Sequence, residues 1–566
     1  MSGREEKLWV VQEAPTSAPP ESPGTHPLIA RILHQRGYGT AGEQRAFLDP
    51  KLNSLSDPFL LPGMDAAATR LLAAIDAGER VALYGDYDVD GVTSLTLFKS
   101  VLQAYGMDAA TFLPHRMDEG YGLSTDGLGR CIAEHAPGLI VAVDCGTSSI
   151  EEVAWLSAKG IDTIILDHHE PRPDGRPDCV ALVNPKLGED YHYLCSAGVV
   201  FKVAHALLKR RPLPGFDLRE HLDIVAVGTV ADIVPLVGEN RALVRRGLHQ
   251  LARSSNPGLT ALAEAAGASA PFDSADIGFK LGPRLNASGR LDSAQASLDL
   301  LLTTDENEAR TLAAGLDARN RERQQIEAKI REEALEMVEA DFDPGRDVAI
   351  VLGSPDWHAG VVGIVASRVS KKFHRPTFII AFDEHGEGKG SGRSVEGVSL
   401  VAAINECRDH LIKGGGHEMA AGITVQQDKL DDFRRAFSEA VGRQVVGDVL
   451  TPRLRIDAET QLDEITDDLL PSYLGLEPMG QDNPRPIFMV RGVQPAAEPR
   501  VLKEKHLRLS LRQGRAVREA MFFGGNEEPL PRPPWDLAFT ISRNEWNGRV
   551  SLQMIVEEIR STQPSP

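Results

Sequence analysis

Short apolar runs alternate with helical patterns through the first half of the chain. Each run is four or five residues long and is bounded by polar or glycine-containing segments. Strands that are buried on both faces have this composition, and helical segments between them indicate βαβ units. The sequence therefore predicts an α/β fold with a parallel sheet, whose strands lie at 81–84, 110–113, 139–143, 163–166 and 179–183.

The pattern changes after this sheet. Residues 304–340 are charge-rich and carry apolar residues at helical spacing, which predicts one long connecting helix; two helices with a kink near Gly315 are the alternative. A second, smaller α/β pattern follows at 347–449. In 450–566 the helical period gives way to strict alternation, as in 507–512, which predicts a small β-barrel of the oligonucleotide-binding (OB) type.

A chain of 566 residues is too long for one core, so several domains are expected. Residues 1–60 form an N-terminal extension. Within it, 1–25 are rich in Pro, Ser and Glu and are expected to be disordered or loosely docked, and 26–60 to be helical. The other parts are the parallel-sheet domain at 61–303, the connecting helix at 304–346, the second α/β domain at 347–449 and the OB-like barrel at 450–566.

The composition is ordinary for a globular chain, with 42% hydrophobic and 25% charged residues. No apolar run reaches the ~18 residues needed to span a bilayer, and the N-terminus lacks the apolar segment of a secretory signal. The five cysteines are odd in number and form no CxxC pair, which disfavours a disulfide framework and a thiolate zinc site. We therefore expect a cytoplasmic monomer with no membrane partner.

The net charge of −20 argues against a surface that coats nucleic acid, yet it is compatible with a local basic surface. Such a surface is expected in the barrel region, where seven basic residues face few acids, chiefly Glu504. They are Arg500, Lys503, Lys505, Arg508, Arg512, Arg515 and Arg518. Phe522, Phe523 and Trp546 could stack on bases there, although core packing is the alternative for some of them. We expect this region to bind a single strand in a salt-sensitive manner.

Three aspartates stand at alternate positions directly after the first predicted strand. Asp86, Asp88 and Asp90 are followed by Gly91 and a helical pattern. In an open α/β sheet, ligands bind at the carboxyl ends of the strands. Three carboxylates there repel one another unless cations neutralise them, and oxygen ligands suit Mg²⁺ or Mn²⁺. The alternative is an acidic turn in which an aspartate caps the helix.

Two further predicted strands end in similar residues. The third strand is followed by Asp144, and the fourth by Asp167-His168-His169. Adjacent histidines converge on a loop, so we expect one to bind metal and the other to serve the substrate; imidazole also favours Mn²⁺ over Mg²⁺. Asp232 lies inside an apolar stretch, where a buried carboxylate needs a partner. Metal ligation explains Asp232, and helix capping is the alternative.

Together these motifs resemble the DHH phosphoesterase superfamily, which is named for a triplet like Asp167-His168-His169. Within it, the sequence more closely resembles the RecJ family of bacterial single-strand-specific 5′→3′ exonucleases. The triplet alone would be weak, but the ordered set spans about 50–560 and is specific. The matching segments are 84–94, 143–146, 167–169, 231–235, 284–290, 357–368, 391–394 and 414–417.

The resemblance implies two ions, Mn²⁺ or Mg²⁺, with Asp144 as the bridging ligand. The implied metal ligands are Asp86, Asp88, Asp90, Asp144, His168 and Asp232. Asp86 and Tyr84 stand where many members carry a histidine, which leaves the ligands of the first ion open. The residues expected to take part in catalysis are Asp88, Asp90, Asp144, His168 and His169. His169 is expected to hydrogen-bond or protonate groups around the scissile phosphate.

The resemblance also implies that the module at 347–449, called DHHA1, binds the substrate. Arginine offers a fork of donors to phosphate, and the glycine-rich backbone at 390–392 and 414–416 permits close approach, although tight turns would also explain these glycines. The substrate-binding candidates are Arg116, Asn286, Arg290, Ser391, Arg393 and His417. For Arg116, an exposed charge without function is the favoured alternative.

We therefore expect a 5′→3′ exonuclease that hydrolyses single-stranded DNA to 5′-mononucleotides in DNA recombination and repair. The implied partners are a single-stranded-DNA-binding protein, helicases and repair factors. One alternative is a small-substrate DHH phosphoesterase, such as an oligoribonuclease, a cyclic-dinucleotide phosphodiesterase or a pyrophosphatase; the barrel and its basic residues favour a polymer. The other is a non-catalytic nucleic-acid-binding protein. Some RecJ proteins carry a further C-terminal domain, which is expected to be absent here or to have been removed.

Overall fold

The computed structural model describes residues 7–13, 17–114, 122–291, 293–546 and 548–562. These residues form two compact units. The larger unit is built from parts of Val10–Gly289, Ser293–Ala314 and Arg455–Pro566, and the smaller unit mainly from Gly315–Leu454. Among the described residues, no helix is long and apolar enough to cross a membrane.

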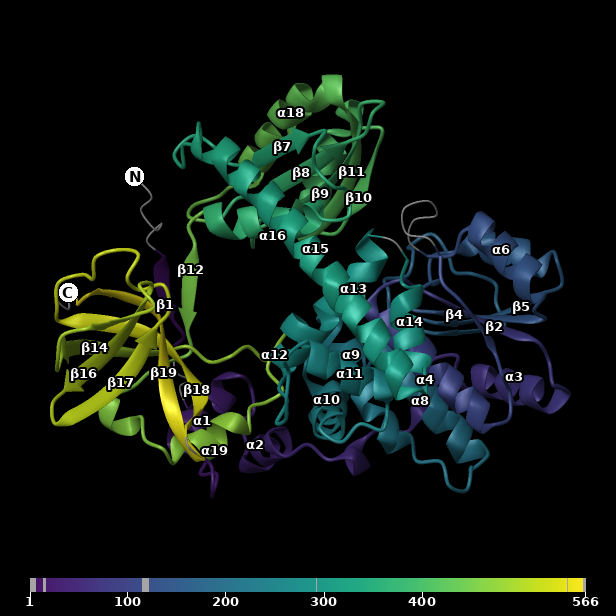
Figure 1. Cartoon of the computed structure of the whole chain (residues 1–566), viewed down its shortest axis with the longest axis horizontal. Coiled ribbons are helices and arrows are strands. Elements are labelled where there is room, and N and C mark those ends of the chain that lie inside the picture. The colour runs from purple at the N-terminus through teal and green to yellow at the C-terminus, as the bar shows by residue number, and fades with distance from the viewer. Residues whose placement is uncertain (1–6, 14–16, 115–121, 292, 547, 563–566) are drawn as a thin grey trace. The chain divides into compact units, whose positions relative to one another are not determined.

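A five-stranded parallel sheet lies at the centre of the first domain of the larger unit (Figure 1). The predicted strands are confirmed, and every pairing between them is parallel. All residues of the two central strands, β2 and β4, are buried, as their continuous apolar runs require. In sheet order the strands are β3 (Ala110–Phe112), β2 (Val81–Gly85), β4 (Leu139–Val143), β5 (Asp162–Leu166) and β6 (Ala181–Val183).

Helices cover both faces of this sheet. On one face, α6 (Thr125–His135) and α7 (Ile150–Ser157) contribute Leu128 and Val153 to a shared apolar cluster with strand residues such as Ile140. On the other face lie α3 (Met64–Ala77), α4 (Val89–Ala104) and α8 (Ser196–Arg210). The domain also contains α9 (Leu222–Ala231), α10 (Gly238–Leu251), α11 (Pro257–Ala265), α12 (Ser274–Asp276), a π-helix (Ile277–Leu281), α13 (Gly282–Leu291) and α14 (Gln295–Leu302).

One continuous helix, α15 (Glu306–Glu339), spans the charge-rich segment. The prediction of a single long helix is therefore confirmed, and the alternative of two helices is wrong. The division between the two compact units falls inside this helix, between Ala314 and Gly315.

The smaller unit is built around a mixed sheet whose strand order is β10-β11-β9-β8-β7. Its strands are β7 (Ile350–Ser354), β8 (Thr377–Phe382), β9 (Glu387–Arg393), β10 (Lys413–Gly416) and β11 (Ala420–Gln426), and its other helices are α16 (Val362–Phe373), α17 (Leu400–Glu406) and α18 (Leu430–Gln444). The only parallel pairing in this sheet is that of β7 with β8. The second α/β pattern is thus realised with a mostly antiparallel sheet.

The glycines of β9 have a packing role. A Cβ atom on Gly392 would lie 2.5 Å from the Phe378 ring, and one on Gly390 would lie 2.8 Å from Ile380. Larger side chains at these two positions would displace the core, so packing by itself requires glycine here. Gly414, Gly415 and Gly416 lie in strand β10, so the alternative that these three glycines form a tight turn is wrong.

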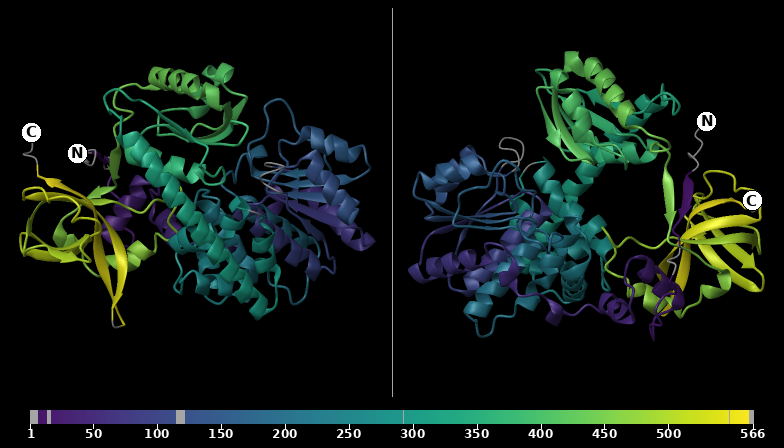
Figure 2. Two further views of the ribbon diagram at one scale, coloured as in Figure 1. Left: turned by 45° about the horizontal axis from the view of Figure 1, so that its top comes forward. Right: turned by 180° about the vertical axis from the view of Figure 1, so that it is seen from behind.

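The C-terminal part of the larger unit is a five-stranded OB-like barrel, as predicted, and Figure 2 shows it from two further sides. The strand order is β14-β18-β19-β17-β16, and a second pairing of β14 with β16 closes the barrel. The barrel strands are β14 (Phe488–Pro495), β16 (His506–Gln513), β17 (Ala516–Phe522), β18 (Trp535–Trp546) and β19 (Arg549–Ser561). Smaller elements flank them: β13 (Ala458–Glu459), α19 (Leu469–Leu474) and β15 (Arg500–Leu502).

The N-terminal segment contains helices α1 (Pro27–Gln35) and α2 (Ala41–Leu48). The buried residues of α1, among them Ile29 and Leu33, belong to the same apolar cluster as the barrel core. The expectation that 1–25 are disordered or loosely docked is wrong for β1 (Leu8–Val11), which pairs with β12 (Arg453–Ile456). Backbone hydrogen bonds to that strand order it independently of its composition.

Candidate metal centre

The register of the parallel sheet places three aspartates at the carboxyl ends of adjacent strands. Gly85 of β2 lies opposite Val143 of β4, which lies opposite Leu166 of β5. These are the last residues of three adjacent parallel strands, about 4.8 Å apart. The residues that follow them, Asp86, Asp144 and Asp167, therefore emerge side by side, and each is at most 2% exposed.

The loop after β2 folds tightly onto the start of α4. Asp88 caps this helix, because its Oδ1 accepts a hydrogen bond of 3.1 Å from the amide of Gly91. A Cβ atom on Gly91 would lie 2.4 Å from the carbonyl oxygen of Asp86, so only glycine permits this turn. The alternative that an aspartate caps the helix therefore holds for Asp88. The same turn also places Asp86, Asp88 and Asp90 near the carboxyl ends of the strands.

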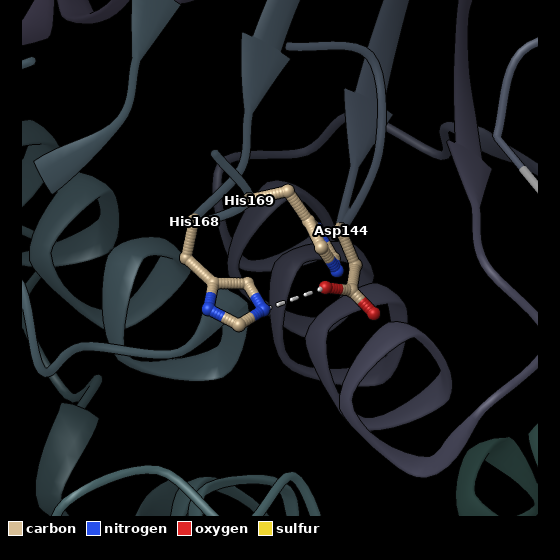
Figure 3. Close-up of side chains that lie close together, drawn as sticks. All are labelled: Asp144, His168 and His169. Carbon is tan, nitrogen blue, oxygen red and sulfur yellow. Dashed lines mark ion pairs between the residues drawn. The ribbon is translucent and has the colours of Figure 1, made fainter. Parts of the chain in front are cut away.

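His168 lies among three carboxylates. Its Nε2 atom is 3.4 Å from Oδ2 of Asp232, 3.5 Å from Oδ1 of Asp144 and 3.9 Å from Oδ2 of Asp90; Figure 3 shows its approach to Asp144. Nε2 of His168 and Oδ2 of Asp232 are both buried, and neither has a hydrogen-bond partner among the described residues. Neighbouring ligands of an octahedral ion at ~2.1 Å are about 3 Å apart, so these spacings fit a shared cation.

A second group of ligand atoms comes from Asp86, Asp88 and Asp144, which all lie within 4.8 Å of one another. Among the described residues, two such groups contain Asp144, the other being formed with His168 and His169. Asp144 therefore lies between the Asp86–Asp88 side of the cluster and the side that contains His168. This is the arrangement required of a ligand shared by two ions.

Burial and mutual repulsion favour the protonated forms of these carboxyls. Burial, followed by the charges of Asp90, Asp88, Asp86 and Asp232, raises the pKa of Asp144 well above its usual value. Burial and the charges of Asp90 and Asp88 raise the pKa of Asp232 to about 9. Burial and Asp88 raise the pKa of Asp90 to about 6. The ionised forms of these carboxyls therefore need nearby positive charge at neutral pH, which divalent cations would supply.

The two histidines have opposite protonation preferences. Burial lowers the pKa of His168 to about 3, so its ring is neutral and Nε2 can donate a lone pair to a metal. For His169, burial opposes protonation, but the bond to Asp167 and the surrounding negative charge outweigh it and raise the pKa. From the sequence we expected one histidine to bind a metal and the other to serve the substrate, and these environments fit that division.

Asp167 orients the histidine loop. Its Oδ1 atom accepts bonds of 2.7 Å from Nδ1 of His169 and 2.7 Å from the amide of His168, and its Oδ2 atom accepts one of 2.9 Å from the amide of Thr147. Burial would raise the pKa of Asp167, but the bond from the His169 ring, the charges of His169 and His168 and the bond from Thr147 together outweigh burial and lower the pKa. Although Asp167 belongs to the triplet, no separate role was predicted for it from the sequence.

Two further residues of this site were missed by the sequence analysis. The side-chain amide of Asn184 donates to Oγ1 of Thr147 and to the carbonyl of His169, at 2.9 and 2.8 Å. Asn184 directly follows β6, so the strand-end rule that located the aspartates would also have found it. Ser196 contacts both Asp90 and Asp144. No signal in the sequence indicated it.

The predicted substrate residues fall into different parts of the chain. Asn286 is half-buried on α13. One turn later in this helix, a Cβ atom on Gly289 would lie 2.9 Å from the carbonyl oxygen of Tyr87. Arg290 is also on α13, but its side chain lies outside the described part of the structure, as does the whole of Arg116.

Ser391, Arg393 and His417 belong to the smaller unit, where they lie near one another. The guanidinium of Arg393 donates to Oγ of Ser391 at 3.1 Å. A Cβ atom on Gly363, at the start of α16, would lie 2.9 Å from Ser391 Oγ and 3.4 Å from Nη2 of Arg393. His417 is exposed in the turn between β10 and β11, close to Ala420, which pairs with Arg393. A guanidinium, a hydroxyl and a helix N-terminus thus converge, as in anion sites.

The basic residues of the barrel are only partly available to a ligand. Arg508 pairs with Glu519 at 2.8 Å, and Arg518 donates to the carbonyl of Ile465. The expectation that Glu504 is the chief acid among them is therefore wrong for Arg508, whose acid partner faces it across the β16–β17 pairing.

The aromatic candidates of the barrel also divide. Phe522 is 4% exposed and packs in the barrel core, whereas Phe523 is 56% exposed. The side chain of Trp546 lies outside the described residues. The core-packing alternative therefore holds for Phe522, whereas the exposed Phe523 is able to stack on a base.

Three family models match separate parts of the chain. The DHH family, N-terminal domain, matches residues 80–229, the DHHA1 domain matches 347–443, and the RecJ OB domain matches 456–558. The first segment contains the parallel sheet and all the aspartates and histidines of the cluster except Asp232. The other two contain the mixed sheet and the barrel.

Relatives match over nearly the whole chain. The single-stranded-DNA-specific exonuclease RecJ of Bacillus subtilis (strain 168) is 37% identical over 542 residues, which cover 94% of this chain and 68% of that protein. RecJ of Dickeya dadantii (strain 3937) is 36% identical over 575 residues, covering 96% and 98%. The crystal structure of RecJ from Thermus thermophilus in complex with Mn²⁺ aligns with a TM-score of 0.84 and 30% identity, covering 98% of this chain and 80% of that one. The ordered domains, the cluster geometry and these similarities together establish that the chain belongs to the RecJ family.

Proposed function

We propose that this chain is a metal-dependent exonuclease specific for single-stranded DNA, which degrades the strand from its 5′ end and releases 5′-mononucleotides. The observation that carries the proposal is the position of Asp144, which groups with Asp86 and Asp88 on one side and lies 3.5 Å from Nε2 of His168 on the other. Its similarity to proteins named single-stranded-DNA-specific exonucleases supports the substrate. The basic and aromatic surface of the barrel is suited to a single strand.

We propose that two ions, Mn²⁺ or Mg²⁺, occupy the cluster. Asp86 and Asp88 would hold one ion, Asp90, His168 and Asp232 would hold the other, and Asp144 would be common to both sets. RecJ structures with Mn²⁺ and with Mg²⁺ support these ions, and the unpartnered Nε2 of His168 and Oδ2 of Asp232 fit a bound cation. When bound, such ions polarise a phosphodiester and lower the pKa of a water molecule.

His169 and Asp167 supply proton chemistry. Nδ1 of His169 donates to Asp167, and we assign its other ring nitrogen, Nε2, to the substrate. Because the surrounding acids favour its protonated form, Nε2 can donate a proton to the leaving 3′ oxygen. Asp167 fixes the ring orientation. The oxygen of a water molecule bonds to phosphorus as the bond between phosphorus and the 3′ oxygen breaks, so the released nucleotide has a 3′-hydroxyl and the remaining strand has a new 5′-phosphate.

We propose that Ser391 and Arg393, together with the N-terminus of α16, bind that 5′-phosphate. Arg393 is half-buried and already ordered by its bonds to Ser391 and to the carbonyl of Gly392, so little entropy is lost when a phosphate binds. The other candidate contacts are Arg116, Asn286, Arg290 and His417. Phe523 and the basic residues of the barrel bind the following nucleotides.

The same proposal extends to organisation and cellular setting. The domain limits are 61–303, 347–449 and 450–566, which the three matched segments support. The protein acts as a cytoplasmic monomer in DNA recombination and repair, beside a single-stranded-DNA-binding protein, helicases and other repair factors. The five cysteines, all free in the structure, support a reducing compartment.

The stabilising effect of Mn²⁺ is expected to grow with pH. In the metal-free protein the folded state binds protons that the unfolded state releases, since the pKa of Asp90 is raised to about 6 and that of Asp232 to about 9. Stability is therefore lost as pH rises from about 4 to about 9. A fixed Mn²⁺ concentration that is 100 times the Kd at pH 8 stabilises by about 2.7 kcal/mol there. The same concentration stabilises less at pH 5.5, where protons compete for the carboxylates. The gain in Tm over an EDTA sample should be larger at pH 8 than at pH 5.5, and an equal gain at both values would contradict it.

Asp144→Asn is expected to abolish hydrolysis. Loss of the shared carboxylate removes several kcal/mol of transition-state stabilisation, which corresponds to a rate lower by about a thousandfold or more. The measurement is time-resolved degradation of single and double strands labelled at either end, with Mn²⁺ or Mg²⁺, alongside a dinucleotide and pyrophosphate. The exposed Asp126→Asn on α6 is the matched control. Near-normal rates for Asp144→Asn, or turnover of the small substrates alone, would refute the proposed function.

Arg393→Ala is expected to erase a preference for 5′-phosphorylated ends. The wild type should degrade a 5′-phosphorylated strand faster than a 5′-hydroxyl strand, and the variant should degrade both at the slower rate. Arg443→Ala serves as the control, because this exposed arginine pairs with Glu406 in the same unit. A preference that persists in Arg393→Ala would rule out this phosphate pocket.

A further inference from the structure

The N-terminus of α8 points directly at the two central carboxylates. Helix starts leave backbone amides without partners, and a side chain at the N-cap usually accepts from them. Here Cys195 occupies the N-cap, and its side chain makes no capping bond. Asp90, which lies on α4, takes its place: it accepts from the amide of Ser196 at 2.7 Å and from the amide of Ala197 at 2.9 Å.

Ser196 also contacts the other central carboxylate. Its hydroxyl donates to Oδ1 of Asp144 at 2.9 Å. Ser196 is fully buried, and Asp144 is 1% exposed, so water does not compete for this bond. One residue therefore holds Asp90 through its backbone and Asp144 through its side chain.

The bonded oxygen of Asp144 is the one that faces His168. Oδ1 lies 3.5 Å from Nε2 of His168, so rotation of this carboxylate would change the spacing on the His168 side and the Asp86 side together. Asp144 also has a left-handed backbone conformation, with φ at 64°, at the end of β4. Asp144 is thus held in an uncommon backbone geometry, and the bond from Ser196 restrains the orientation of its side chain.

We propose that Ser196 is a positioning residue for the metal centre: its hydroxyl fixes the carboxylate orientation that allows Asp144 to serve both ions. The inference rests on the proposed function, because it concerns ions that the cluster would hold. A hydrogen bond to a ligating carboxylate sets the direction of its free lone pairs, and removal of such a partner typically weakens metal affinity about 10–100-fold.

A purely structural role can be separated from this one. In Ser196→Ala both amides that bond Asp90 remain, so the cap of α8 is retained and only the bond to Asp144 is lost. The matched control is Ser297→Ala, because Ser297 is fully buried in the same unit and its hydroxyl donates to the carbonyl of Leu285 at 2.8 Å. Ser196→Thr keeps a hydroxyl and tests rescue.

The test is Mn²⁺ binding by the full chain, followed by calorimetry and by electron paramagnetic resonance, with the unfolding midpoint of each variant measured in EDTA. Ser196→Ala should bind at least one Mn²⁺ about 10-fold or more weakly. Its exonuclease activity should fall at limiting Mn²⁺ and recover as Mn²⁺ is raised, with an unchanged KM for the strand. Ser196→Thr should bind more tightly than Ser196→Ala, and Ser297→Ala should match the wild type.

Three results would overturn the inference: wild-type Mn²⁺ affinity in Ser196→Ala, an equal loss of affinity in Ser297→Ala, or no advantage of Ser196→Thr over Ser196→Ala when both are folded in EDTA. A wild-type protein that binds no Mn²⁺ would instead refute the metal-dependent function itself. The failure of the inference and the failure of the function are therefore distinguishable.

Discussion

Repulsion among buried carboxylates is the constraint on which this structure depends. Asp90 and Asp144 are each 1% exposed, and Asp86 is 2% exposed. Burial without neutralisation is costly for a single carboxylate and more so for several together. The pKa values of Asp90, Asp144 and Asp232 are raised because the ionised form of each carboxyl is disfavoured in this environment. A fold that keeps such a cluster is poised to bind cations.

The surrounding elements hold the carboxylates in place against this repulsion. The parallel sheet sets the spacing of Asp86, Asp144 and Asp167, because their strands end in register. Backbone amides hold Asp88 and Asp90, and His169 and Thr147 hold Asp167. Each of these bonds restrains a carboxylate in a fixed direction. Rigid elements that aim ligands at one point lower the entropy lost on binding, which is the physical basis of a preorganised metal site.

Local sequence features predicted the fold well and indicated residues that the structure groups at the candidate site. Continuous apolar runs located all five parallel strands, and the rule that ligands lie at strand ends located Asp86, Asp144 and His168. What could not be predicted were contacts between residues far apart in the chain, such as the capping of α8 by Asp90 from α4. The packing role of Gly392 and the pairing of β1 with β12 likewise depend on distant partners. Asn184, by contrast, follows a predicted strand and was within reach of the same rule.

The sharing of Asp144 by two ions is the central claim, and anomalous scattering from crystals of the full chain grown with Mn²⁺ tests it most directly. The geometry predicts two manganese peaks ~3.5–4 Å apart. One peak should lie among Asp90, His168 and Asp232, the other beside Asp86 and Asp88, with the carboxylate of Asp144 between them. A single peak at saturating Mn²⁺, or two peaks without Asp144 between them, would contradict the claim.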